Sequence, residues 1–301
     1  MVFRAWTVIL VAGVTARHPV LPGTIHAMKV AAVQMVSTPD VERNLAAAAS
    51  LIAQAAAAGA ALVALPEYFC LLGRRDTDKL AIAEGDGDSG APIQRFLSRT
   101  ARSHGLWLVG GTLPVRTASA DRVLNRCCVY APDGSHAAHY DKLHLFAFDN
   151  GRESYDEGRT LQAGSMPVAL RAGPLSRGES LRVGLSICYD LRFPELYRAL
   201  MQPPCDVLCV PSAFTYTTGR AHWELLLRAR AVENQCYVLA PAQGGTHENG
   251  RRTWGHSMVV DPWGEVLAVC VEGEGLAIAD VDPARIAQVR SQLPALAHRR
   301  L

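Results

Sequence analysis

Short apolar segments of strand length recur along the chain, and they limit its fold more than any other feature of the sequence. Residues 60–65 and 106–111 are unbroken apolar runs, and similar segments cover 181–187, 206–210 and 236–242. Strands without polar alternation are buried on both faces, as in sheets that are covered by other layers. The chain is therefore expected to place a layer against each side of its sheets.

Predicted helices alternate with these strands. They cover residues 41–58, 91–104, 194–201 and 222–235. Thr38-Pro39-Asp40 is a typical helix start, and Gly59 is a natural helix stop. Alternation of strands and helices predicts a mixed α/β fold with helices on the outer faces of its sheets.

Hairpins and a long loop complete the pattern. Residues 123–130 and 136–143 flank an Asp-Gly turn, and 257–261 and 265–269 flank Pro-Trp-Gly. Further strands are predicted at 29–35 and 275–281, and the polar, Gly-rich residues 147–166 are predicted to form a long surface loop. No Pro/Gly/Ser-rich linker divides the chain, and so residues 28–301 are predicted to form one domain.

Composition excludes several classes of protein. The 301 residues are 49% hydrophobic and carry 30 Lys and Arg against 28 Asp and Glu. Disordered chains are poor in apolar residues, and so this chain is expected to fold. No stripe of basic residues could neutralise phosphates, which argues against nucleic acid as a partner. No apolar run reaches the roughly 18 residues of a membrane span, and so no membrane partner is expected.

The first 27 residues form a distinct N-terminal extension. Arg4 precedes an apolar stretch over residues 5–14, a pattern similar to a short signal peptide. The alternative is an upstream start codon, with the protein itself beginning at Met28. We favour the second interpretation, in which residues 1–27 are a start-site artefact or disordered.

Eight cysteines are scattered along the chain, and none forms a CxxC pair. A chain of this length needs no disulfide framework. We therefore expect reduced, mostly buried thiols and a cytoplasmic protein. Cys205 and Cys209 would share one face of a strand, but no second pair of ligands lies nearby, and so no metal site is expected.

Three residues with useful chemistry, Glu67, Lys142 and Cys188, stand at the ends of predicted strands. In open α/β sheets, ligands bind at the carboxyl ends of strands. Singly, each residue has an ordinary explanation as a solvated charge or a buried thiol. Together they form a catalytic set, because a cysteine nucleophile needs a base and a lysine can stabilise a tetrahedral oxyanion. A serine hydrolase is disfavoured, since Gly-x-Ser-x-Gly is absent.

Around these residues the sequence resembles the nitrilase, or carbon–nitrogen hydrolase, superfamily. The resemblance runs from Met28 nearly to the C-terminus. The matching segments are 64–69 (ALPEYF), 140–145 (YDKLHL), 184–195 (GLSICYDLRFPE), 211–214 (PSAF), 222–231 (HWELLLRARA) and 255–264 (GHSMVVDPWG). Their combination is highly specific.

The resemblance implies a four-layer αββα sandwich, with helices outside two mixed sheets. It assigns Glu67 as general base, Cys188 as the nucleophile that forms a thioester, and Lys142 as oxyanion stabiliser and proton donor. Glu157 matches the second glutamate of the family better than Glu153 does, and it would orient Lys142 and the substrate. The family needs no cofactor, and its members pair through outer faces, which implies a homodimer or higher homo-oligomer.

The residues after the cysteine narrow the substrate. Tyr189-Asp190 stands where typical nitrilases carry Trp-Glu, and this resembles the Nit subgroup, which includes ω-amidases and the amidase of deaminated glutathione. The resemblance implies hydrolysis of a small acidic amide rather than of a nitrile or a peptide. Deaminated glutathione, which would give 2-oxoglutarate and cysteinylglycine, is the expected substrate.

Arg192 is the main candidate for recognising that substrate, because a guanidinium binds a carboxylate through two parallel hydrogen bonds. The alternative is a structural ion pair with Glu195 or Asp190. The expected substrate-binding residues are Tyr189, whose N–H would be the second oxyanion donor, together with Arg192, Glu195, Phe214, Thr215 and His222. His222 is equally explained as a structural histidine, and Arg220, where close relatives often have proline, as a solvated arginine or a carboxylate contact.

Three other functions stay open. An ω-amidase acting on 2-oxoglutaramate and an N-carbamoyl amide hydrolase would use the same three catalytic residues. A non-catalytic scaffold would have lost some of them, and it is disfavoured because Glu67, Lys142 and Cys188 are all present.

Overall fold

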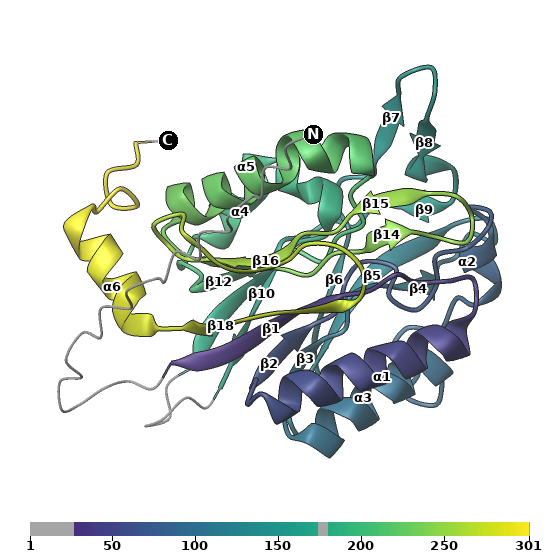
Figure 1. Ribbon diagram of the computed structural model, residues 1–301, viewed down its shortest axis with the longest axis horizontal. Helices are drawn as coiled ribbons and strands as arrows, with labels where there is room; N and C mark the ends of the chain where they lie inside the picture. The colour runs from purple at the N-terminus through teal and green to yellow at the C-terminus, as the bar shows by residue number, and fades with distance from the viewer. Residues whose placement is uncertain (1–26, 174–179, 301) are drawn as a thin grey trace, which may run out of the picture.

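The computed structural model describes residues 27–173 and 180–300 (Figure 1). Apart from residue 27, the predicted N-terminal extension lies outside the described residues. From Met28 onward the chain forms two main sheets packed face to face, with helices on the outer face of each. This is the mixed α/β, four-layer αββα arrangement that the resemblance implies.

The first sheet is mixed and includes the strand predicted after Met28. Its strands are β1 Met28–Gln34, β2 Leu62–Ala64, β3 Trp107–Val109, β4 Leu113–Arg116, β5 Val123–Tyr130, β6 His136–Asp141, β9 Leu161–Gln162 and β18 Gly275–Val281. Within the described residues they follow the order β18-β1-β2-β3-β5-β4, and β6 and β9 also pair with β5. β1, β2 and β3 run parallel, whereas β18 is antiparallel to β1.

Strand β1 shows why both faces of this sheet are apolar. Val30 and Ala32 belong to the core between the two sheets, whereas Ala31 and Val33 pack with the helices outside. All four are fully buried. The covering helices are α1 Val41–Ala57 and α3 Pro92–His104. Alternate side chains of one strand therefore serve two different layers.

The second sheet has a parallel centre with antiparallel neighbours. Its strands are β10 Val168–Ala172, β11 Leu181–Leu185, β12 Val207–Cys209, β13 Tyr237–Ala240, β16 Ser257–Val260 and β17 Val266–Cys270, in that order across the sheet. Helices α4 Pro194–Leu200 and α5 Tyr216–Asn234 lie against its outer face.

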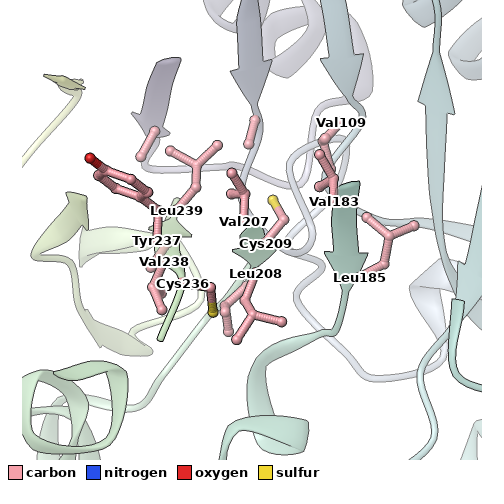
Figure 2. Packing of buried hydrophobic residues seen from close by; sticks show 14 of the residues in the cluster. Val109, Val183, Leu185, Val207, Leu208, Cys209, Cys236, Tyr237, Val238 and Leu239 are labelled. Atoms are coloured by element: carbon pink, nitrogen blue, oxygen red, sulfur yellow. The ribbon is translucent and has the colours of Figure 1, made fainter. Parts of the chain in front are cut away.

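The two sheets are joined by apolar packing. Figure 2 shows side chains of β11, β12 and β13 gathered with Val109 of β3. Val207, Cys209 and Leu239 are completely buried there. Full burial of such a side chain contributes about 1.5–3 kcal/mol. This packing therefore fixes the position of the strand ends of one sheet relative to those of the other.

Several small elements gather at one end of the sandwich (Figure 1). They are α2 Asp78–Ala81, β7 Ala147–Asp149, β8 Ser154–Asp156, the 3-10 turn η1 Glu157–Arg159, β14 Gly244–Thr246 and β15 Arg252–Trp254, while α6 Pro283–Gln292 lies at the opposite end. The loop prediction for 147–166 was therefore wrong in part, since β7 and β8 form a hairpin. Three-residue strands are too short for an alternation pattern to reveal them.

Helix α5 begins at Tyr216, six residues before the predicted start at His222. Thr215 caps it, because its side chain accepts from the N–H of Thr218. Gly219 lies within this helix, and a Cβ there would lie 2.3 Å from the Cβ of Trp254. A tertiary contact therefore explains this glycine.

Candidate active site

Glu67 and Lys142 come from neighbouring parts of the first sheet. Glu67 follows β2, and Lys142 follows β6, where its N–H donates to the carbonyl of Asn125 over 3.1 Å. The Lys142 Nζ lies 2.8 Å from Glu67 Oε1, and Asn125 Nδ2 donates to the same oxygen over 3.0 Å. The side chains of Glu67 and Lys142 are at most 1% exposed.

Glu157 provides a second carboxylate for Lys142, with Nζ–O distances of 2.8–2.9 Å. The other Glu157 contacts fix its position: Phe146 N donates to it over 2.7 Å and the Tyr68 hydroxyl over 2.8 Å. The structure thus brings Glu157 to Lys142, as the resemblance implies. Glu153, the other glutamate of this segment, lies in the β7–β8 turn and has only a long contact, 3.4 Å, with Thr217.

The electrostatics of this cluster keep its charges in place. Burial opposes the charge of Lys142, but Glu157 and Glu67 outweigh it, so that the pKa of Lys142 is raised. Burial also opposes the charge of Glu157, yet Lys142 and several hydrogen bonds hold the pKa of Glu157 below its usual value. A cationic ammonium therefore stands ready beside the position where an oxyanion would form.

Cys188 comes from the second sheet. It follows β11 and opens the 3-10 turn η3 Cys188–Arg192, with a left-handed φ of 49°. Its N–H donates to Pro211 over 2.9 Å. A positive φ is rare in a non-glycine residue and is found at constrained functional sites. The N–H of Tyr189, expected as an oxyanion donor, makes no hydrogen bond with the described residues outside this turn.

The turn is held by Asp190, which is completely buried. Asp190 Oδ2 accepts from the N–H of Ile187 over 2.9 Å and from the Tyr140 hydroxyl over 2.7 Å. Asp190 Oδ1 lies 2.7 Å from His144 Nδ1. Because Tyr140 and His144 flank Lys142, Asp190 links the turn of the cysteine to the strand end that carries the lysine.

The thiol of Cys188 is held in its protonated form. Burial, followed by the charge of Glu67, raises the pKa of Cys188 well above its usual value, and Lys142 offsets this only in part. A thiol must lose its proton to act as a nucleophile. The site therefore needs a base that takes this proton during attack, and Glu67 lines the same pocket as Cys188.

One pocket unites most of the predicted residues. It is lined by Glu67, Phe146, Glu157, Cys188, Tyr189, Arg192, Ala213, Phe214, Thr215, Thr218 and Arg251. Glu195 does not join them. It is exposed in the first turn of α4, and so the expected substrate contact from Glu195 finds no support. Arg220 is exposed on α5, one turn inside the helix rather than ahead of it.

Arg192 points its charge at this pocket without a carboxylate partner among the described residues. Its Nη1 lies 3.2 Å from His222 Nδ1, and its guanidinium lies over the rings of Phe214 and Tyr189 at 5.3 and 5.8 Å. The alternative of an ion pair with Asp190 or Glu195 is wrong, because Asp190 is occupied by the turn that it holds. His222 is exposed and contacts Arg192 rather than lining the pocket.

Sequence reasoning missed four residues of the site: Tyr68, Asn125, Asp190 as the holder of the turn, and Arg251. Asn125 had a signal, since it and Arg126 are polar residues in the middle of an apolar strand. Tyr68 directly follows Glu67, and Asp190 is two residues beyond Cys188. Arg251 had no such signal in the sequence, because it reaches the pocket only through the β14–β15 hairpin, which is far along the chain from Glu67 and Cys188.

Within residues 27–173 and 180–300, no group of three or more His, Cys, Asp and Glu side chains is arranged to hold a metal ion. No described helix combines the length and apolar character needed to cross a membrane. All eight cysteines are free thiols.

Comparison with known proteins decides the family. The sequence profile of the family described as Carbon-nitrogen hydrolase matches residues 29–291. The chain belongs to this family. As a carbon–nitrogen hydrolase it is an enzyme that hydrolyses amides. Its candidate active site is the pocket lined by Glu67 and Cys188, with Lys142 bonded to Glu67.

Relatives place it within the family. The chain is 44% identical over 272 residues to the deaminated glutathione amidase of Synechocystis sp. (strain PCC 6803 / GT-S), covering 89% of this chain and 97% of the relative. It is 38% identical to the chloroplastic omega-amidase of Arabidopsis thaliana, covering 89% and 71%. The crystal structure of Saccharomyces cerevisiae Nit3, a member of branch 10 of the nitrilase superfamily, superposes with a TM-score of 0.82 at 32% identity, covering 92% and 98%. The resemblance to the Nit subgroup is thereby confirmed.

Proposed function

We propose that the chain hydrolyses the amide bond of deaminated glutathione and releases 2-oxoglutarate and cysteinylglycine. The observation that carries this proposal is Arg192, a guanidinium without a carboxylate partner among the described residues, in the same pocket as Cys188. A 2-oxo acid presents a carboxylate that such a guanidinium binds through two hydrogen bonds. The similarity to a protein named deaminated glutathione amidase supports the same substrate.

In the proposed first step, Cys188 attacks the amide carbonyl. The C–S bond forms as Glu67 takes the thiol proton, which the raised pKa of Cys188 keeps in place until that moment. Lys142 and the N–H of Tyr189 stabilise the oxyanion of the tetrahedral intermediate. The C–N bond then breaks, and the leaving amine takes a proton from the Glu67–Lys142 pair, which are 2.8 Å apart.

In the second step, water hydrolyses the thioester. Glu67 takes a proton from the attacking water, and the same donors stabilise a second oxyanion. The C–S bond breaks, the thiol recovers its proton, and the acid is released. Glu157 contributes by holding Lys142 charged and in place, since it lies within 2.9 Å of the ammonium.

A substrate panel with Arg192→Lys tests the proposal. The panel contains deaminated glutathione, 2-oxoglutaramate, an N-carbamoyl amino acid and a simple neutral amide. Lysine cannot reproduce the bidentate fork, and each charge-assisted hydrogen bond is worth about 1.5–3 kcal/mol. We expect Arg192→Lys to lower kcat/KM roughly ten- to a hundredfold on the acidic substrates and much less on the neutral amide.

Cys188→Ala serves as the blank, because it should fold but form no acyl-enzyme. Equal losses on acidic and neutral substrates would make Arg192 structural. Faster turnover of 2-oxoglutaramate than of deaminated glutathione would make the enzyme an ω-amidase, a function that the similarity to the Arabidopsis protein favours. Turnover of the N-carbamoyl amino acid alone would make the enzyme an N-carbamoyl amide hydrolase. No turnover of any substrate would indicate a non-catalytic scaffold.

We further propose a homo-oligomer that works in the cytoplasm. Leu225 and Val232 of α5 are 68% and 48% exposed, and Trp263, in the turn that packs against Val232, is 56% exposed. Such an apolar face fits a second copy of the chain. The eight free thiols suit a reducing compartment.

A further inference from the structure

Arg251 is the second arginine of the pocket, and its position depends on non-local pairing. It precedes β15, whose Trp254 N–H donates to the carbonyl of Phe214 over 3.0 Å. Arg251 Nη2 donates to the Ala213 carbonyl over 2.9 Å, and its guanidinium lies 5.1 Å from the ring of Tyr155. These contacts hold the guanidinium across the pocket wall that includes Ala213 and Phe214.

Arg251 has no ion-pair partner among the described residues. No carboxylate of the described residues lies within 4 Å of its nitrogens, and its Nε is buried without a hydrogen-bond partner. A buried donor that is left unpaired costs about 1–3 kcal/mol. An anionic ligand group that reaches the guanidinium would supply the counter-charge that the described residues do not.

An outer cleft begins at Arg251. It has a volume of about 510 Å³ and adjoins the catalytic pocket, with which it shares Phe146, Glu157 and Arg251. The size lies within the roughly 300–1,000 Å³ of small-molecule sites. Arg192 lines only the inner pocket. The inner pocket alone is much smaller than this cleft.

Unpaired cations also gather in the outer cleft. Lys79 and Arg152 line it and, like Arg251, form no ion pair with a described carboxylate. Lys79 donates to the Thr160 hydroxyl over 3.2 Å and lies over the ring of Tyr68. Burial lowers the pKa of Lys79, the charges of Glu157 and Asp76 oppose this shift, and those of Lys142 and Arg251 add to it. The cleft is lined by six Lys or Arg side chains against four Asp or Glu side chains, and so an anionic ligand group would meet a net positive charge here.

We propose that Arg251 binds the carboxylate of the leaving group, so that the substrate extends from Arg192 past Cys188 to Arg251 and the outer cleft. This inference rests on the proposed function and deepens it. Arg192 recognises the acid that remains on the enzyme, whereas Arg251 recognises the amine that departs. Arg251 thereby favours amides of carboxylated amines, such as a dipeptide, over primary amides that release ammonia.

Three substrates with the same acyl group test this assignment. They are deaminated glutathione, its derivative with the C-terminal carboxylate converted to a carboxamide, and 2-oxoglutaramate. For the wild-type enzyme, kcat/KM on the carboxamide derivative should be roughly ten- to a hundredfold lower than on deaminated glutathione, because one charge-assisted contact is lost. Arg251→Gln should lower kcat/KM for deaminated glutathione by the same factor, make it equal to that of the carboxamide, and affect 2-oxoglutaramate far less.

Arg159→Gln is the matched control. Arg159 lies next to the cleft but outside its lining, is 77% exposed and pairs with Asp156, and so its loss should change none of the three values. Arg251→Lys, which keeps the charge, should recover part of the loss. The comparison of deaminated glutathione with its carboxamide uses only the wild-type enzyme. It therefore tests recognition of the carboxylate even if Arg251→Gln folds poorly.

Two results would overturn the assignment. Equal wild-type turnover of the acid and the carboxamide would show that the leaving-group carboxylate is not bound. An equal loss in Arg251→Gln on all three substrates would make Arg251 a structural residue. Absence of turnover on all three by the wild-type enzyme would instead refute the proposed function, and the assignment of Arg251 with it.

Discussion

At the residue scale, the site depends on opposing effects of burial and charge. Lys142 is fully buried with two carboxylates around it, and the cost of removing these charges from water is offset only while the contacts are complete. The same burial raises the pKa of Cys188. The cluster therefore keeps one group charged and another neutral a few ångströms apart, which is the division of roles that a nucleophile and its oxyanion stabiliser require.

Glu157→Gln tests this balance through its pH dependence. The pKa of folded Glu157 is lowered, and so its charge stabilises the fold above the ordinary glutamate pKa of about 4.3 and loses this effect as the pH falls through the folded pKa. We expect Glu157→Gln to lower the free energy of unfolding by about 3 kcal/mol at neutral pH. The difference from the wild type should shrink below about pH 4, as measured by urea denaturation.

Glu153→Gln is its control, since Glu153 lies in the same segment but has only a long contact with Thr217. Its effect should stay within about 0.5 kcal/mol at every pH. Equal effects of the two substitutions, or a Glu157→Gln effect that is the same at neutral pH and well below about pH 4, would contradict the charge-based account.

At the element scale, α5 is fitted to the β14–β15 hairpin through Gly219. Alanine favours a helix by about 0.8–1.0 kcal/mol over glycine, but the added Cβ would lie 2.3 Å from Trp254. Overpacking costs about 1–3 kcal/mol, and so we expect Gly219→Ala to lower the melting temperature. Because this hairpin carries Arg251, activity on deaminated glutathione should fall as well.

Thr217→Ala is the control, since Thr217 is exposed in the same turn of α5, and it should change neither the melting temperature nor the activity. A Gly219→Ala variant that is more stable than the wild type would show that the contact with Trp254 is loose.

Local sequence signals predicted the longer helices and strands. The residues whose roles depend on contacts between distant segments could not be predicted in this way. The ends of α1 followed from Asp40 and Gly59 to within one residue, and β18 matched its predicted range because a seven-residue strand carries a clear pattern. The three candidate catalytic residues were singled out because each follows a predicted strand and matches a motif of the resemblance. Arg251 and Asp190 acquire their roles only from contacts with Ala213 and with Tyr140 and His144, which no local pattern encodes.

At the scale of the whole molecule, the outer face of α5 is the surface proposed for self-association. Leu225→Glu would place a charge in the centre of that contact, and burying an unpaired charge is costly. We expect a shift towards the monomer in analytical ultracentrifugation, with the fold retained because Leu225 is already 68% exposed. Leu293→Glu, at the end of α6 and 50% exposed, is the control and should leave the assembly unchanged. A monomeric wild type, or an unchanged Leu225→Glu oligomer, would refute this interface.

The nucleophile and its base belong to different sheets, and this has a consequence for how activity appears during folding. A folding intermediate with only one sheet formed would carry either a cysteine without a base or a glutamate–lysine pair without a nucleophile. Such an intermediate is chemically silent, and so the reactive centre first exists when the two sheets dock. Activity should therefore return during refolding no earlier than the packing between the two sheets.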